Sequence, residues 1–406
     1  MSKHTLCLVL CVMWVVTHAK LQWQEINPNH EAVYTTEANA HPAARYAHAL
    51  FCDGPNVYVF GGVNNEGEKR DFWKYESATR RWLWLSDGSG PVGRSHMAYW
   101  TLYNETDTAF YMYGGSTRNL GALGDLWHYV KVAREWKPLS NGDGPGARWG
   151  SITWIDAMRQ RLFLYGGRRA SQLLSDLWHY DLNTFSWHAH PESSDPGPLA
   201  FGAAVSLNDT VYLFGGQTNA STQSVSARFW KLNLQSLIWT EQEMPQDVQI
   251  PEARQEFTFG TIPNENALLL MHGRHGARVF GEAVWKLSLG DHTWTRDTSQ
   301  VFPARRYAAG YCINVNHSLV VAGGAYNGVQ YSNDVWEYAQ RSAFATVLNI
   351  FKFDLNYTNT AASYLVAMTT LLLVFAVAFS IASCVYHCKR KREKTQFPLH
   401  IVDSDF

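Results

Sequence analysis

The chain carries a motif that recurs about every 50 residues along most of its length. Each full copy holds two tryptophans nine residues apart, as in "DLWHYDLNTFSW" over residues 176–187. A repeat of this length is typical of propellers and solenoids, in which each unit packs on its neighbours. The first tryptophans of the six copies are Trp73, Trp127, Trp178, Trp230, Trp285 and Trp336. The second tryptophans of five copies are Trp82, Trp136, Trp187, Trp239 and Trp294.

Each copy has the pattern of four short strands. A segment that begins with proline precedes a short β-rich run ending in paired glycines, such as "VYVFGG", and a polar loop leads to the first tryptophan. These runs are too short for helices, and glycine permits the turns that close them. We predict strands a, b, c and d, in chain order, within six repeats: 42–90, 91–144, 145–195, 196–250, 251–302 and 303–338.

The paired glycines, the aromatic residue beside them and the two spaced tryptophans resemble the kelch-repeat family, in five of six copies over residues 42–338. The resemblance implies an all-β fold, a six-bladed kelch β-propeller with one four-stranded sheet per blade. The tryptophans would then pack between neighbouring blades. Copy five departs from the pattern at His272, and copy six lacks the second tryptophan.

The missing tryptophan has a candidate replacement near the start of the chain. Trp23, in "LQWQEI", repeats the aromatic signature, so residues 20–41 are predicted to hold a closing strand d for the last blade and a linker. Such closure removes exposed sheet edges. The alternative is that residues 343–353 fill this place.

Cysteines are sparse in the repeats, where only Cys52 and Cys312 occur. They fall near the ends of strand a in the first and last blades, which are neighbours in a closed ring. They could form a disulfide if their α-carbons come within about 7 Å, and two buried free thiols are the alternative.

Two apolar segments predict a single-pass type I membrane protein. Residues 1–19 have the order of a secretory signal peptide: a positive head, an apolar stretch and small residues for cleavage. After a stalk at 339–363, residues 364–386 carry no charge and would span a bilayer as a helix of about 34 Å. The basic cluster at the start of the tail, 387–406, predicts that this tail is cytoplasmic. We expect the plasma membrane, with an endomembrane as the alternative.

The cytoplasmic tail carries candidate sites of its own. Cys384 and Cys388 flank the membrane boundary and are candidates for palmitoylation. The basic cluster is expected to contact anionic lipid, and the last three residues resemble a ligand for PDZ domains. Candidate N-glycosylation sites on the lumenal side are Asn104, Asn208, Asn219, Asn316 and Asn356.

A ring of arginines marks the candidate ligand-binding face, which carries the d-a and b-c loops. Arg45, Arg94, Arg148, Arg254 and Arg306 stand three residues after the prolines, with Phe201 in the irregular fourth copy. One interpretation is structural, with each arginine paired to the Asp of its Asp-x-Trp motif. The other is a site for an acidic peptide, a carboxylate or an anionic glycan. Copy five has Ala283 in place of that Asp, so Arg254 lacks its expected partner.

These features favour a non-catalytic receptor or adhesion module that binds a lumenal or extracellular protein or acidic glycan. The net charge of -1 argues against nucleic acid, and no motif calls for a cofactor or a metal. His128 and His179 are expected on the solvent-facing side of their strands. The alternatives are a membrane-tethered glycan-processing enzyme, since one fold hosts both enzymes and binders, and a cargo receptor of the secretory pathway.

Overall fold

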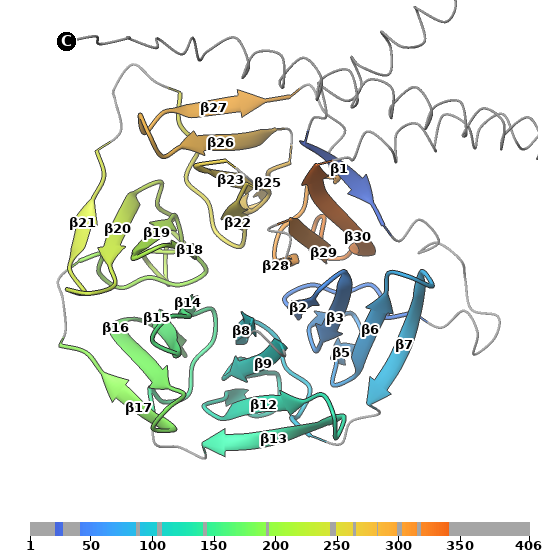
Figure 1. The fold of residues 1–406 in the computed structure, drawn as a ribbon. Coiled ribbons are helices and arrows are strands. Elements are labelled where there is room, and N and C mark those ends of the chain that lie inside the picture. The colour runs from blue at the N-terminus through green and yellow to red at the C-terminus, as the bar shows by residue number, and fades with distance from the viewer. Residues whose placement is uncertain are drawn as a thin grey trace, which may run out of the picture. The chain divides into compact units, whose positions relative to one another are not determined.

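The computed structural model describes residues 21–26, 41–86, 90–103, 108–140, 144–191, 195–243, 249–262, 265–281, 283–298, 303–314 and 318–340. Within them every regular element is a β-strand. Six four-stranded antiparallel sheets stand around a central axis as the blades of a propeller (Figure 1). Strand a of each blade is nearest the axis and strand d is outermost (Figure 1).

The first three blades follow the predicted strand order. Blade one consists of β2 (Ala49–Asp53), β3 (Asn56–Phe60), β6 (Phe72–Glu76) and β7 (Arg81–Ser86). Blade two consists of β8 (Ala98–Tyr103), β9 (Thr108–Tyr113), β12 (Leu126–Val130) and β13 (Glu135–Ser140). Blade three consists of β14 (Ile152–Asp156), β15 (Arg161–Arg169), β16 (Gln172–Asp181) and β17 (Ser186–Ala189).

The next two blades keep the same order. Blade four consists of β18 (Ala203–Leu207), β19 (Thr210–Phe214), β20 (Phe229–Asn233) and β21 (Trp239–Glu241). Blade five consists of β22 (Thr258–Thr261), β23 (Ala267–Met271), β26 (Val284–Ser288) and β27 (Trp294–Asp297). His272 takes the place of the first paired glycine, and its left-handed φ of 64° lies within the range of 58° to 69° that this glycine has in the other copies.

Blade six is assembled from both ends of the propeller. Its strands a, b and c are β28 (Gly310–Ile313), β29 (Leu319–Ala325) and β30 (Tyr331–Gln340). Strand d is β1 (Leu21–Glu25), which pairs with β30 so that Trp23 faces Tyr338. The N-terminal segment therefore occupies the outer position. The alternative segment, residues 343–353, lies outside the described residues.

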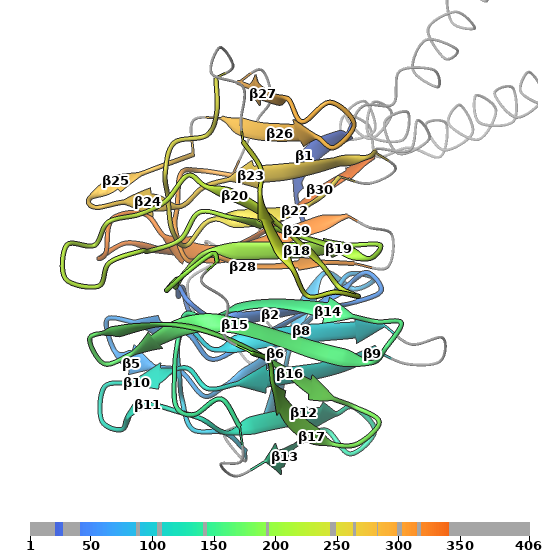
Figure 2. The same cartoon turned by 90° about the vertical axis from the view of Figure 1, so that its left-hand side faces the viewer.

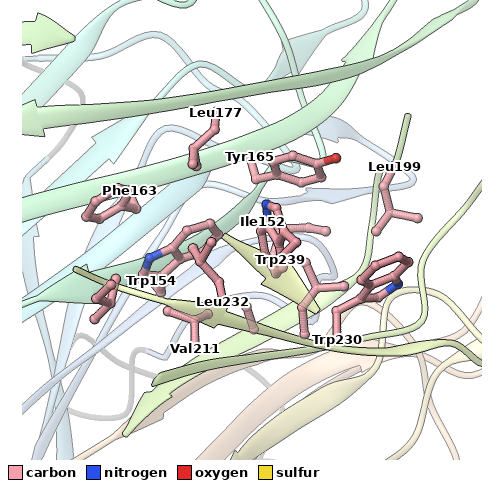
Figure 3. Packing of buried hydrophobic residues seen from close by; sticks show 13 residues of the cluster. Ile152, Trp154, Phe163, Tyr165, Leu177, Leu199, Val211, Trp230, Leu232 and Trp239 are labelled. Atoms are coloured by element: carbon pink, nitrogen blue, oxygen red, sulfur yellow. The ribbon is translucent and has the colours of Figure 1, made fainter. Parts of the chain in front are cut away.

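In the five repeats that have a second tryptophan, this residue packs against the preceding blade. Trp239 of β21, for example, belongs to a cluster with Trp154 and Tyr165 of blade three (Figure 3). Trp136 of β13 contacts Phe51 and other aromatic residues of blade one. Trp23 lies in the corresponding place, in a cluster that includes strands of blade five. These buried aromatic plates hold each blade to the one before it.

A disulfide joins the first and last blades. Cys52 of β2 and Cys312 of β28 are bonded, with their α-carbons 5.8 Å apart. This bond and the pairing of β1 with β30 are two of the contacts that close the ring.

The membrane features predicted from the sequence lie in other parts of the chain. The signal peptide, the span at 364–386 and the tail with Cys384 and Cys388 are outside the described residues, as are Asn104, Asn316 and Asn356. In the ranges that the structure describes, it contains no helical segment that could serve as a membrane span.

Candidate binding face

The face that carries the d-a and b-c loops has three small hairpins in addition to the blades. They are β4–β5 (Val63–Asn64 and Gly67–Glu68), β10–β11 (Ser116–Thr117 and Gly121–Ala122) and β24–β25 (Arg274–His275 and Arg278–Val279). Figure 2 shows β5, β10, β11, β24 and β25 on the same side of the ring. Each hairpin lies within a b-c loop, so this face carries chain segments in addition to the four strands of each blade.

The five predicted arginines lie beneath this face. Their exposed fractions are 0% to 3%, so all five side chains are buried. In Arg148, Nη1 and Nη2 donate to the two carboxylate oxygens of Asp176 at 2.7 and 2.8 Å, and Nη1 also donates to the carbonyl of Gly166. The same bidentate pairing joins Arg45 to Asp71, Arg94 to Asp125 and Arg306 to Asp334. These pairs match the structural interpretation of the arginine ring, and a ligand-binding role of these four arginines stays a prediction.

In four repeats the first tryptophan donates a hydrogen bond to the same aspartate that pairs with the arginine. We call these three residues an Arg–Asp–Trp unit. Nε1 of Trp178 donates to Oδ2 of Asp176 at 2.8 Å, and Trp73, Trp127 and Trp336 make the corresponding bond in their blades. Each unit therefore joins strand c to the start of strand a through a charged, geometrically fixed network. This role of the tryptophans was not visible in the sequence, which indicated only apolar packing.

The fourth copy has a different register from the one predicted. The carbonyl of Leu199 accepts a hydrogen bond from Gly167, as the carbonyl of Arg148 does from Gly115. Leu199, and not Phe201, therefore stands in the arginine position. Two prolines stand close together in this copy, and Pro196, not Pro198, is the residue that matches Pro145 of the third copy.

Around the axis, one residue from each blade forms a closed ring of backbone hydrogen bonds of 2.7 to 2.9 Å, each N–H donating to the carbonyl of the preceding blade. Each has a left-handed φ between 48° and 66°. This conformation is costly for residues other than glycine, so the closed ring must hold it in place. The ring residues are Ala47, His96, Gly150, Phe201, Glu256 and Ala308.

Two ring residues meet across the axis. Nε2 of His96 lies 3.2 Å from Oε1 of Glu256, and Nε of Arg274 donates to the other oxygen of that carboxylate. Burial alone would raise the pKa of Glu256, but the hydrogen bond from His96 and the charge of Arg274 lower it to about 2. The carboxylate is thus a fixed, neutralised charge and a poor general base near neutral pH.

A cavity of about 310 Å³ lies along the axis, lined by residues of the inner strands and by His96, Phe201 and Glu256. Tyrosines from blade two cross part of it. Tyr99 and Tyr103 donate to the carbonyls of Tyr311 and Ile313 in β28, at 3.0 and 2.6 Å. No group of histidine, cysteine or acidic side chains in the described part of the chain could hold a metal.

The sequence predicts that His179 and the glycosylated asparagines lie at the surface. His179 is only 6% exposed and lies against His188 and His190, so its expected solvent-facing position was wrong. The reason is that its ring packs against Phe163 on strand b and against His188 and His190 at strand d. Of the candidate glycosylation sites, Asn208 is in the a-b turn of blade four and Asn219 is in its b-c loop.

The repeats are similar in sequence to known kelch domains. The family model described as the KLHDC2/KLHL20/DRC7 Kelch-repeats domain matches residues 100–301. Tip elongation aberrant protein 1 of Schizosaccharomyces pombe is 29% identical over 46% of this chain and 17% of its own length. Human Kelch domain-containing protein 10 is 26% identical over 63% of this chain and 60% of its own. Human Host cell factor 2 is 28% identical over 49% of this chain and 29% of its own.

Proposed function

The chain belongs to the kelch-repeat family, and on this premise we propose that its propeller is a non-catalytic module that binds a partner protein through the face of the d-a and b-c loops. Kelch propellers mediate binding between proteins. The observation that carries the choice of face is the set of three additional hairpins, all on one side of the closed ring.

The tips of these loops have the mixed character of a binding surface. Leu120, in the turn of β10–β11, is 65% exposed, and Val329, in the b-c loop of blade six, is 66% exposed. Arg118 and Arg278 supply charged groups beside apolar ones, each more than half exposed. Protein interfaces commonly have apolar side chains at the centre and polar or charged side chains at the rim.

The opposite face is the competing surface. Its a-b and c-d turns carry Val132, Met158, Phe185 and Ile238, which are 64% to 96% exposed in blades two to four. We assign this face the lesser role because the candidate glycosylation sites of its a-b turns, which include Asn208, would cover it with glycans.

A comparison of the two faces tests the proposal. The tagged full chain is cross-linked on intact cells, and captured proteins are quantified for the parent, for Leu120→Asp with Val329→Asp, and for Val132→Asp with Phe185→Asp. We expect proteins bound by the parent to be lost with the first pair and kept with the second. The reverse result would transfer the function to the opposite face. Equal melting temperatures for all three proteins provide the control for folding.

We also propose that the propeller is displayed on the lumenal side of a single-pass type I membrane protein, at the plasma membrane. The support is the sequence of residues 1–19 and 364–386. Endoglycosidase digestion should shift the mobility of the parent in electrophoresis, and surface biotinylation should label it. Glycosylation without surface labelling would instead favour a cargo receptor of the secretory pathway.

A further inference from the structure

Blade five keeps two of the three members of the Arg–Asp–Trp unit that four other blades complete. Arg254 is 3% exposed and keeps the bonds its counterparts make to backbone carbonyls, from Nε to Glu252 and from Nη1 to His272, both at 2.9 Å. Its carboxylate partner is missing, because Ala283 stands where the other blades have aspartate. Among the described residues, which do not include Glu282, none accepts a hydrogen bond from Nη2 of Arg254.

The tryptophan of this blade has lost the same partner. In the complete units Nε1 of the tryptophan donates to the aspartate at 2.6 to 2.8 Å. Trp285 is the equivalent residue, and no described residue accepts a hydrogen bond from its Nε1. Two donors that elsewhere share one carboxylate therefore remain in blade five without it.

Blade four lacks the unit, but its described residues include no buried arginine without a carboxylate partner. There both members are replaced, the arginine by Leu199 and the aspartate by Arg228. Arg228 pairs with Glu241 and lies 4.5 Å over the ring of Trp230. Blade five has lost only the acidic member, which leaves a buried guanidinium with a vacant carboxylate position.

A pocket occupies the space beside this position. It has a volume of about 270 Å³ and is lined by Arg254, Ala283 and Trp285, together with Phe280, Arg278 and Arg296. The guanidinium of Arg254 lies 4.2 Å over the ring of Phe280.

The charges of the pocket favour an anion. Its described lining holds three arginines and one carboxylate, that of Glu252. Glu252 forms an ion pair with Arg278 at 2.6 Å, in which both side chains are more than half exposed. Burial lowers the pKa of Arg254 to about 10, so this guanidinium still carries its charge at neutral pH.

We propose that this pocket binds the carboxylate group of a ligand, in the position that an aspartate side chain holds in blades one, two, three and six. The two carboxylate oxygens would accept from Arg254 and Trp285, in the bidentate geometry that the complete units display. The carboxylate can come from a small organic acid or from an acidic side chain of a partner protein. This site can be tested independently of the proposed partner face, because the residues of the pocket alone supply the donors that would bind a free carboxylate.

The test uses a variant that supplies the missing group from the chain itself. Ala283→Asp should complete the unit, raise the melting temperature without ligand, and close the pocket. The matched control is Ala277→Asp, which adds the same charge at an exposed position in the same blade. The full chain is titrated with sodium acetate, with sodium chloride at equal ionic strength as reference, and binding is followed by calorimetry and by melting temperature.

We expect acetate to bind and stabilise the parent and the Ala277→Asp variant, and Ala283→Asp to weaken binding at least about tenfold. The source of the carboxylate is tested with a blocked Gly-Glu-Gly peptide and its Gln counterpart. Tighter binding of the Glu peptide than of acetate supports a partner side chain, and binding of acetate alone supports a small acid. The proposal is wrong if neither acetate nor the Glu peptide binds or stabilises the parent more than sodium chloride does. It is also wrong if Ala283→Asp binds acetate as tightly as the parent does.

Discussion

At the scale of single residues, the buried arginines give the sharpest prediction. Asp125→Ala removes the carboxylate that neutralises Arg94, whose side chain is 0% exposed. Because the remaining charge is buried and unpaired, we expect the free energy of unfolding to fall by about 3–5 kcal/mol. Chemical denaturation of the parent and the variant measures this loss.

The control removes both members of the pair. Arg94→Met combined with Asp125→Ala leaves no buried charge, so the double variant should recover part of the stability lost in the single one. An Asp125→Ala variant as stable as the parent would contradict the structural role of the units. It would also weaken the argument that the vacant position beside Arg254 attracts an anion.

At the scale of elements, β1 is the least conventional part of the blades, because it comes from the opposite end of the propeller. Trp23 is 5% exposed, lies 5.1 Å from the ring of Tyr338, and shares a cluster with Leu269 and Met271 of blade five. Trp23→Ala should therefore lower the free energy of unfolding by about 3–5 kcal/mol. Denaturation of Gln22→Ala, at the exposed neighbouring position, should differ from the parent by less than about 0.5 kcal/mol.

The same elements show what the sequence can predict. The blades and the place of Trp23 follow from a motif whose spacing repeats, and the Arg–Asp units follow from residues that recur at fixed positions. The contact between His96 and Glu256 could not be predicted, because it joins blades two and five, 160 residues apart, and neither residue repeats in the other copies. The register of the fourth copy was misjudged where two prolines stand close together and the arginine is absent.

At the scale of the whole molecule, the propeller is a ring that could open only between its first and last blades. Two ties cross this place. One is the disulfide between Cys52 and Cys312, which are 260 residues apart in the chain. The other is the pairing of β1 with β30, because β1 precedes blade one in the chain but forms a strand of blade six. The closed ring of backbone bonds around the axis also crosses it, where Ala47 donates to Ala308 at 2.7 Å. Ring closure therefore depends on several contacts between the first and last blades, and no single blade provides it alone.

The two ties should be coupled, because either one alone keeps the first and last blades together. We expect Cys312→Ser to lower the free energy of unfolding by about 2–5 kcal/mol, since the bond restricts the unfolded chain. Combined with Trp23→Ala, the loss should exceed the sum of the two single losses by about 0.5–3 kcal/mol. A double-mutant cycle by chemical denaturation measures this excess. Strictly additive losses would mean that blades one and six are held by their own packing, and that the two ties stabilise the fold independently of ring closure.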